Sequence, residues 1–182
     1  MLVFWRYGYD ATSVSQLTEA MGIGPPSMYA AFGDKRRLFE EAINHYMKNY
    51  GAFMARSFQE PNVYDAVARM LLQAADMFTH SDHPPGCMLI TATTNCSPES
   101  APVQERLRSI RAYTARTLEG KFAEAIASGQ LPTHADARAL ALFFSATLQG
   151  MSAQARDGAS RAELRAVART ALRAWPRSRV RR

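Results

Sequence analysis

The stretch GYDATSVSQLTEAMGIGPPSMYAAFGDK, residues 8–35, carries the start and stop signals of two short helices. Ser13 and Gln16 form a capping box, which satisfies the first free N–H groups of a helix. Gly22 suits the left-handed position just after that helix, and the proline pair that follows suits the first turn of the next one. Two short helices around a glycine-containing turn predict a helix-turn-helix.

The second of these helices presents a face of small and hydroxyl-bearing side chains. Met28, Ala31 and Phe32 share one side of it by their i, i+3 and i+4 spacing. A small outer face can enter the major groove of DNA, which is roughly 12 Å wide, and hydroxyl groups can donate to phosphates or base edges. The pattern therefore predicts a recognition helix for double-stranded DNA. Its outer face comprises Pro25, Pro26, Ser27, Tyr29 and Ala30.

These residues resemble the DNA-binding half of the TetR/AcrR family of bacterial transcriptional regulators. The family progression Gly-Tyr-x-x-Thr-Ser, Leu-x-x-Ala-x-Gly, Ser-x-Tyr-x-x-Phe and x-Lys-x-x-Leu is matched at every position between Gly8 and Leu38. The resemblance is strong over residues 3–46 and is limited to the helical layout beyond them. It implies a ligand-responsive, sequence-specific regulator, in most cases a repressor that a small molecule releases from a near-palindromic operator.

The resemblance also implies roles for individual residues. Thr12 and Ser13 would contact the DNA backbone at the start of the first helix of the motif, and Lys35 would clamp a phosphate. The outer face of the recognition helix, defined above, would read the bases. These assignments are the expected DNA-binding residues.

The beginning of the chain departs from the family pattern. Only residues 1–7 precede the Gly-Tyr motif, where the family has a basic arm and a full first helix. So short a helix depends on docking Val3, Phe4 and Tyr7 onto the bundle. Two explanations are open: a start codon assigned inside a longer reading frame, or a shortened protein with weakened DNA binding. The second leaves an alternative function, a helical ligand- or partner-binding dimer that has lost DNA binding.

The charge distribution does not single out the motif. The chain has 22 Lys and Arg against 16 Asp and Glu, a formal net charge of +6. Residues 1–50 hold five basic and five acidic side chains, whereas residues 173–182 hold five arginines and no acid. The positive charge therefore reflects the C-terminal tail rather than the predicted DNA-binding region.

Beyond the motif, apolar residues recur at helical spacing and no segment alternates with the period of a strand. The sequence therefore predicts an all-α fold. Further helices are expected at 34–54, after Pro61, and at 87–95, 102–128, 134–156 and 160–175. With 182 residues the chain can form a small head and one larger core. We expect a helix-turn-helix domain at 1–50, a helical ligand-binding and dimerisation domain at 51–176, and a basic disordered tail at 177–182.

The helix expected at 134–156 is apolar on more than one face, and together with the helix at 160–175 it offers more apolar surface than one core requires. Paired across a two-fold axis, they would form a four-helix interface of a homodimer. The other interpretation is that both helices belong to the core of a single chain. The expected interface residues are Leu140, Phe144, Leu148, Met151, Leu164, Val167 and Ala171.

Apolar and sulfur-containing side chains of the second domain are candidates for a ligand pocket. Such a lining suits a hydrophobic or aromatic small molecule. Cys87 at a helix N-terminus can act as a sensor of electrophiles or oxidants, or it can be a buried inert thiol. His80, His83 and Cys87 match no strong metal-ligand spacing, so no metal is expected. The candidate pocket residues are Met70, Met77, Phe78, Cys87, Met88, Tyr113, Leu118 and Phe144.

The sequence lacks the motifs that are typical of enzymes and of membrane or secreted proteins. The sequence has no glycine-rich phosphate loop, no hydrolase nucleophile elbow and no zinc-protease motif, and its four histidines are scattered. We therefore expect no catalytic residues and no cofactor. No apolar run approaches the roughly 20 residues that cross a bilayer, and residues 1–5 are too short for a signal peptide. The expected protein is cytoplasmic, with operator DNA, a small-molecule inducer and a second copy of itself as partners.

Overall fold

The computed structural model describes residues 1–92 and 96–176, and every regular element in these ranges is helical. The all-α prediction is therefore confirmed. The first four helices are α1 (Leu2–Tyr7), α2 (Val14–Met21), α3 (Pro25–Phe32) and α4 (Lys35–Asn49). They are followed by α5 (Ala52–Ser57), α6 (Val63–Phe78), α7 (Met88–Thr91), a 3-10 turn (Pro98–Ser100), α8 (Ala101–Ala127), α9 (Ala137–Arg156) and α10 (Arg161–Leu172).

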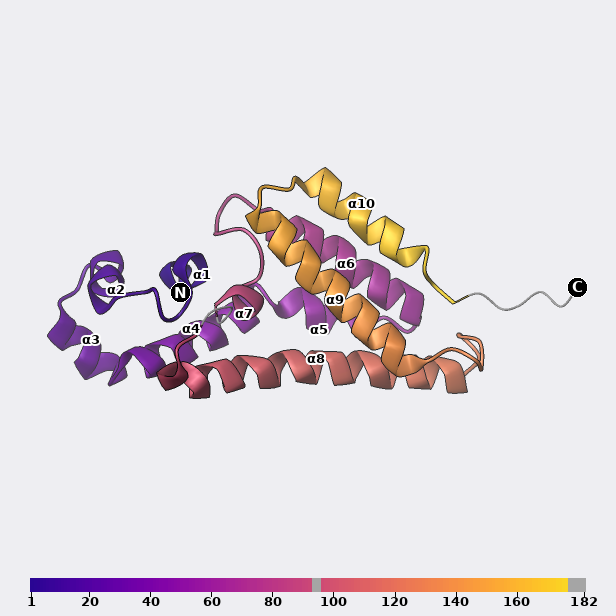
Figure 1. Ribbon diagram of the computed structural model, residues 1–182, viewed down its shortest axis with the longest axis horizontal. Helices are drawn as coiled ribbons and strands as arrows, with labels where there is room; N and C mark the ends of the chain where they lie inside the picture. The colour runs from indigo at the N-terminus through magenta and orange to yellow at the C-terminus, as the bar shows by residue number, and fades with distance from the viewer. Residues whose placement is uncertain (93–95, 177–182) are drawn as a thin grey trace, which may run out of the picture.

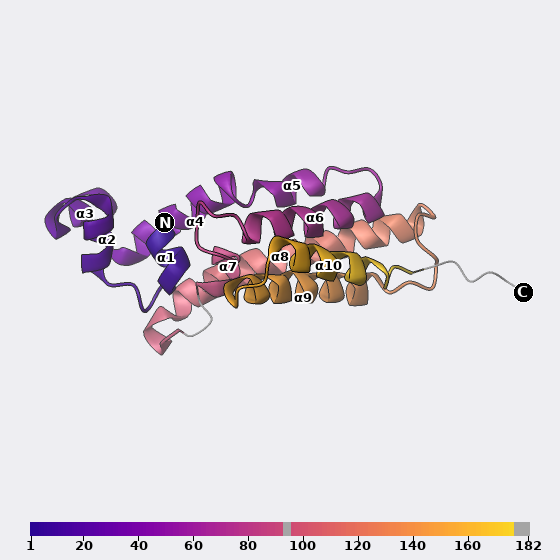
Figure 2. The same cartoon turned by 90° about the horizontal axis from the view of Figure 1, so that it is seen from above.

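We call residues 1–50 the head and residues 51–176 the body. Figure 1 shows the head at one end of an elongated molecule, with α8 running along most of its length. Figure 2 shows α4 leading from the head into the body, where α6, α9 and α10 lie alongside α8. Within the described ranges, none of the helices combines the length and the apolar content that crossing a membrane requires.

The helix-turn-helix forms as its capping residues predict. The Ser13 hydroxyl accepts from the N–H of Gln16, and the Gln16 side chain accepts from the N–H of Ser13. Gly22 then ends α2 with a φ of 67°, which the missing side chain permits. α3 begins with its two prolines, and Asp34 caps α4 by accepting from the N–H of Arg37 at 2.7 Å.

Two expected helices differ from the structure. The single helix predicted at 34–54 is divided into α4 and α5, because the N–H groups of Tyr50 and Gly51 both turn back to the carbonyl of Tyr46. The helix predicted at 87–95 is the four-residue α7, and residues 93–95 of that prediction lie outside the described residues. Its β-branched residues already weakened the helical pattern. The predicted tail at 177–182 also lies outside the described residues.

The buried apolar residues form two clusters. The body core gathers side chains of α5, α6, α8, α9 and α10, such as Leu71, Phe122 and Phe144, all of them beyond residue 50. The head core gathers residues of α1 to α4 around Phe39 and is completed by residues of the body. These contributions from the body are Met88, Ala92, Val103 and Leu107.

Helix α1 docks differently from the prediction. Phe4 and Trp5 are its buried residues, at 0% and 1% exposure, whereas Tyr7 is 51% exposed. The expected docking by Tyr7 was wrong, because the short helix turns Trp5 toward α4. There the Trp5 ring meets the rings of Tyr46 and Tyr50 edge to face, with centroids 4.8 and 5.2 Å away.

Candidate nucleic-acid interface and ligand cavity

The outer face of α3 lies open to solvent, as the sequence predicts. Pro25, Pro26, Ser27 and Ala30 are exposed, and Tyr29 is 48% exposed. We call these five residues the reading face. Below them Met28 is completely buried in the head core and fixes the helix from behind. Ala31, expected on the inner side, is exposed as well, so α3 rests on the head mainly through Met28 and the half-buried Phe32.

The two residues before α2 have different roles. Ser13 is exposed and its N–H and hydroxyl are used in the capping box. Thr12 is only 1% exposed, and its hydroxyl donates to the carbonyl of Gly8 at 2.6 Å. The Thr12 side chain therefore closes the turn between α1 and α2 and cannot reach DNA. The expectation that it contacts the backbone is corrected, because the hydroxyl is directed into the chain.

Lys35 lies in the first turn of α4. Its ammonium group lies 4.6 Å from the centre of the Tyr9 ring, a cation–π contact. Partial burial lowers the pKa of Lys35, and the nearby carboxylate of Asp10 opposes this. Arg36 and Arg37 follow and are exposed, so this end of α4 offers positive charge to a phosphate. The phosphate contact of Lys35 itself stays a prediction.

A contact that the sequence did not indicate ties the head to the start of α8. The Asp10 carboxylate accepts the Ser97 N–H at 2.5 Å and also accepts the hydroxyl of Ser100. One residue earlier, the Tyr9 N–H donates to the carbonyl of Ala92 at 2.9 Å. Burial of the Asp10 carboxylate opposes its ionisation, but the hydrogen bonds from Ser100 and Ser97 outweigh this and lower its pKa. The turn after α1 is thus held by the body through an ionised carboxylate.

A second such contact joins α1 to the loop between α6 and α7. The His83 ring stacks on Trp5, with centroids 4.3 Å apart and planes within 16°. Tyr50 packs edge-on against the same imidazole. Burial lowers the pKa of His83, which favours the neutral form of the stacked ring. Among the described residues, no group of three or more possible ligands is gathered around a metal-sized space.

The same loop is fixed to α9 at its other end. Gly86 has a φ of +82°, and a side-chain carbon there would lie 2.8 Å from the carbonyl oxygen of Ser152. The next N–H, that of Cys87, donates to the Ser152 hydroxyl at 2.8 Å. Only glycine fits this approach. The segment 79–92 therefore connects α9 to the head.

A cavity of about 220 Å³ opens where α4, α5, α7 and α8 meet. No charged side chain lines it. Of the predicted pocket residues, Phe78, Cys87 and Tyr113 line this cavity. The full lining is Tyr46, Met47, Gly51, Ala52, Phe53, Met54, Ala55, Phe58, Phe78, Cys87, Leu89, Ile110, Tyr113, Thr114 and Leu148.

The other predicted pocket residues do not line this cavity. Met70, Leu118 and Phe144 are packed in the body core, and Met88 is packed in the head core, each at most 1% exposed. Met77 is half-buried between the two cores. The apolar character of Met70, Met88, Leu118 and Phe144 therefore serves packing, and the pocket prediction is corrected for these four, whereas Met77 lines a separate, more polar cavity beside Tyr50 and His83. Sequence spacing alone does not separate a cavity wall from a filled core.

The Cys87 thiol is buried rather than activated. The Tyr46 hydroxyl donates to its sulfur at 3.2 Å. Burial raises the pKa of the Cys87 thiol, and it also raises the pKa of Tyr46. The N–H groups of Leu89 and Ile90 at the start of α7 act to lower this pKa, but burial outweighs them. These features favour the interpretation of an inert thiol over that of a sensor, and Cys87 and Cys96 are both free.

The predicted dimer-interface residues are mostly buried within the single chain. Phe144, Met151 and Leu164 are at most 1% exposed, and Leu148 and Ala171 are each 8% exposed. Leu140 is half-buried against the same core. A partner cannot reach the five buried side chains, so the prediction is corrected for them, whereas Leu140 and the 42% exposed Val167 remain predicted interface residues. The large apolar residues that α9 exposes instead are Leu142 and Phe143.

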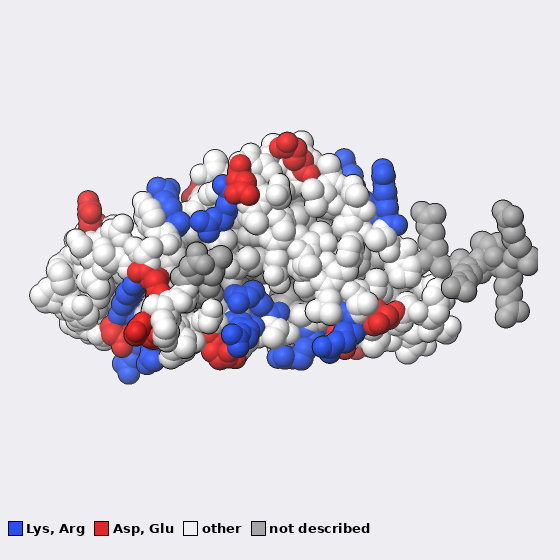
Figure 3. Space-filling model, in the orientation of Figure 1, with Lys and Arg blue, Asp and Glu red and all other residues white. Residues whose placement is uncertain are grey.

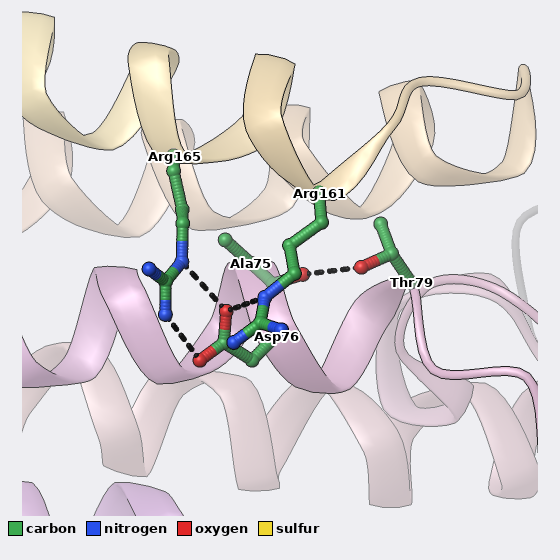
Figure 4. Close-up of polar contacts among 5 residues, drawn as sticks. All are labelled: Ala75, Asp76, Thr79, Arg161 and Arg165. Atoms are coloured by element: carbon green, nitrogen blue, oxygen red, sulfur yellow. Dashed lines mark hydrogen bonds and ion pairs between the residues drawn. The ribbon is translucent and has the colours of Figure 1, made fainter.

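Helix α10 is clamped to α6 by one carboxylate. Figure 4 shows Asp76 between Arg161 and Arg165, which approach it from α10. Arg165 makes two parallel bonds to it at 2.8 Å and Arg161 one at 2.7 Å. The hydrogen bonds from Arg165 are the largest cause that lowers the pKa of Asp76. Partial burial of the carboxylate acts in the opposite direction, and the hydrogen bond from Arg161 lowers the pKa further. The ion pair therefore fixes the outer side of α10 while Leu164 packs inward.

Charged side chains are unevenly spread over the face shown in Figure 3. Lys and Arg gather along the lower edge, over α8, whereas the area over α9 and the tip formed by α2 and α3 are mostly uncharged.

Comparisons with known proteins cover nearly the whole chain. The family model for bacterial regulatory proteins of the tetR family matches residues 1–42, and that for a tetracyclin repressor-like C-terminal domain matches residues 64–175. The chain is 39% identical over 178 residues to the HTH-type transcriptional repressor ComR of Escherichia coli strain K12, covering 97% of this chain and 85% of ComR. It is 30% identical over 168 residues to the HTH-type transcriptional repressor BdcR of the same strain, covering 92% of this chain and 80% of BdcR.

Solved structures are similar as well. A cysteine mutant of the TetR family transcriptional regulator CifR, complexed with 26-base-pair double-strand operator DNA, superimposes with a TM-score of 0.91 at 39% identity. The superposition covers 96% of this chain and 92% of that one.

Proposed function

Because the chain belongs to the tetR family of bacterial regulatory proteins, we propose that it is a transcriptional repressor that binds operator DNA as a homodimer and is released by a small molecule. The observation that carries this proposal is the exposed reading face on α3, held from behind by the fully buried Met28. The similarity to CifR, solved on its operator, supports the same use of the helix. DNA as the partner implies action in the cytoplasm.

Two-fold symmetry sets the form of the operator. Two recognition helices in one dimer reach half-sites that lie about 34 Å apart, one turn of B-DNA, or a multiple of this. The expected operator is therefore nearly palindromic. Arg36 and Arg37, exposed beside the reading face, supply phosphate contacts that add affinity without sequence preference.

The proposed dimer surface is the exposed apolar side of α9 together with Val167 of α10. Leu142 is 57% exposed and Phe143 is 42% exposed, and Ala146 and Gly150 continue the exposed strip along α9. The mostly uncharged area over α9 in Figure 3 agrees with this location. Burial of large apolar residues against a second copy is the main source of stability for such interfaces.

The proposed inducer site is the 220 Å³ cavity between head and body. Its lining contains hydroxyl and thiol groups but no charge, so it suits a small neutral molecule that is largely apolar. The cavity wall includes Gly51, where the chain passes from α4 to α5, and Leu89 of α7, a helix that also contacts the head. A ligand that fits better when these elements separate would shift the population away from the DNA-binding state.

Regulators of the tetR family are generally transcription factors without enzymatic activity, and we infer the same for this chain. The alternative of a dimer that has lost DNA binding is not favoured. Although α1 is short, it buries Phe4 and Trp5 completely enough to hold the helix-turn-helix in place.

Selection from a random-sequence duplex library tests the proposal. The purified full chain is incubated with the library at physiological salt, and the retained duplexes are sequenced. We expect enrichment of one near-palindromic site, which the Tyr29→Ala variant no longer enriches. The Tyr64→Ala variant, which changes a tyrosine of similar exposure on the body, should behave like the original chain. Absence of any enriched site would contradict the proposal and leave the ligand-binding dimer.

A further inference from the structure

The reading face lacks the side chains that recognise bases by paired hydrogen bonds. Such recognition uses Arg or Lys for guanine and Asn or Gln for adenine. Helix α3 has the sequence PPSMYAAF and contains none of these four residue types. Its exposed hydrogen-bonding groups are the single hydroxyls of Ser27 and Tyr29.

The backbone at the start of α3 is also poor in donors. A helix N-terminus normally offers free N–H groups to an anion or a base edge. Pro25 and Pro26 occupy the first two positions of α3 and have no N–H. What this end of the helix presents instead is the apolar surface of two proline rings.

Two polar side chains before and within α2 are engaged in the fold. The Gln16 side chain on α2 accepts from Ser13, and the Thr12 hydroxyl donates to Gly8 inside the turn. The reading face is therefore mainly carbon, and its residues other than Tyr29 are small. A surface of this kind can approach the groove floor closely.

The apolar feature of the major groove is the C5 methyl group of thymine, and small apolar side chains are known partners for it. We propose that α3 recognises thymine, through contacts of Pro25, Pro26 and Ala30 with thymine methyl groups. Each half-site is then defined by T·A pairs rather than by guanines. This inference rests on the proposed function and specifies the chemistry of the same interface.

Atom-level changes in the DNA test this inference directly. The duplex enriched by the library selection is resynthesised with 2′-deoxyuridine in place of one thymidine at a time, which removes a single methyl group. We expect two or more positions in each half-site to weaken binding about fourfold each, the factor that corresponds to burial of one methyl group. Replacement of guanines by 7-deazaguanine, which removes the N7 acceptor, should change the affinity less than twofold.

A matched pair of variants separates a methyl contact from a change in DNA shape. In Ala30→Gly, the loss caused by deoxyuridine at one of these positions should fall toward onefold, because the contacting methyl group is gone. Ala31→Gly changes an exposed alanine of the same helix on the side of the buried Met28, and it should retain the full loss. Both variants lower the helix propensity of α3 equally, so the difference reports the contact.

Three results would overturn the inference: stronger weakening by 7-deazaguanine than by deoxyuridine, equal weakening in Ala30→Gly and Ala31→Gly, or no response to either base analogue. In each of these cases the operator is still bound and the proposed function stands. If the library selection enriches no site at all, the proposed function fails and the inference fails with it.

Discussion

The head core and the body core differ in whether residues of the other part complete them. The body core is built entirely from residues beyond position 50, among them Phe53, Leu71 and Phe144. The head core combines aromatic residues of α1 and α4 with residues of α7 and α8, such as Met88 and Leu107. The head therefore depends on the body for the completion of its core, whereas the body core uses no residue of the head.

This asymmetry shows how the orientation of the reading face is controlled. The head is joined to the body through α4, through the Trp5–His83 stack and through the hydrogen bonds of Asp10 and Tyr9. The segment 79–92, which carries His83 and the Ala92 carbonyl, also supplies Cys87 and Leu89 to the cavity wall. A ligand that displaces the cavity wall would therefore also displace body residues that complete the head core. The predictions below test this dependence and the roles assigned to the body, from the largest effect to the smallest.

Trp5→Ala should cause the largest loss. It removes the ring that packs against Tyr46, Tyr50 and His83, and truncation of a buried aromatic residue lowers the free energy of unfolding by about 3–5 kcal/mol. Urea denaturation followed by circular dichroism measures it. Tyr7→Ala, on the exposed side of the same helix, should cost less than about 0.5 kcal/mol. A loss for Trp5→Ala no larger than that for Tyr7→Ala would contradict the buried, shared role of the Trp5 ring.

Phe143→Glu should break the proposed dimer while leaving the fold of each chain intact. The side chain is 42% exposed in the single chain, and loss of a central aromatic contact costs about 2 kcal/mol or more, at least ~30-fold in the dissociation constant. Sedimentation equilibrium measures the change. Tyr113→Glu, at a 68% exposed aromatic residue of α8, is the control and should remain dimeric. An unchanged dimer in Phe143→Glu would place the interface elsewhere on the body.

Asp76→Asn should destabilise the body by about 1–2 kcal/mol, since it removes a charged hydrogen-bond acceptor at a partly exposed site. The pKa of Asp76 is lowered in the folded chain from its ordinary value of 3.8, mainly by Arg165. The stabilisation is therefore complete above that value and is lost as the pH falls below it toward the folded pKa. Thermal unfolding between pH 2 and 6 should show this loss in the original chain and a flatter profile in the variant. Equal profiles would show that the ion pair is not a stabilising contact.

Asp10→Asn should have the smallest effect, about 1 kcal/mol, because one neutral acceptor remains for Ser97 and Ser100. Chemical denaturation measures the loss. Asp157→Asn, at an exposed acid of the body, should change stability by less than about 0.5 kcal/mol. The same loss in both variants would remove Asp10 from the contacts that join head and body.

Local signals made the helix-turn-helix predictable. The Ser13–Gln16 capping box, Gly22 and the proline pair each act within four residues, so the printed sequence contains both partners of each interaction. The reading face was predictable for the same reason, since it follows from the spacing along one helix. The buried position of Thr12 was not, because it depends on how the turn after α1 folds back.

The sequence by itself determined the all-α class, the helix boundaries near caps and prolines, and the residues that face outward on α3. Only the tertiary structure decided that Trp5 meets His83, that Asp10 meets Ser97, and which apolar residues line a cavity. It also decided that Phe144 is core while Phe143, its neighbour, is exposed. The physical reason is that an apolar stripe in the sequence indicates only that its side chains are buried away from water. Its partner, whether its own core, a ligand or a second copy, is set by contacts between residues far apart in the chain.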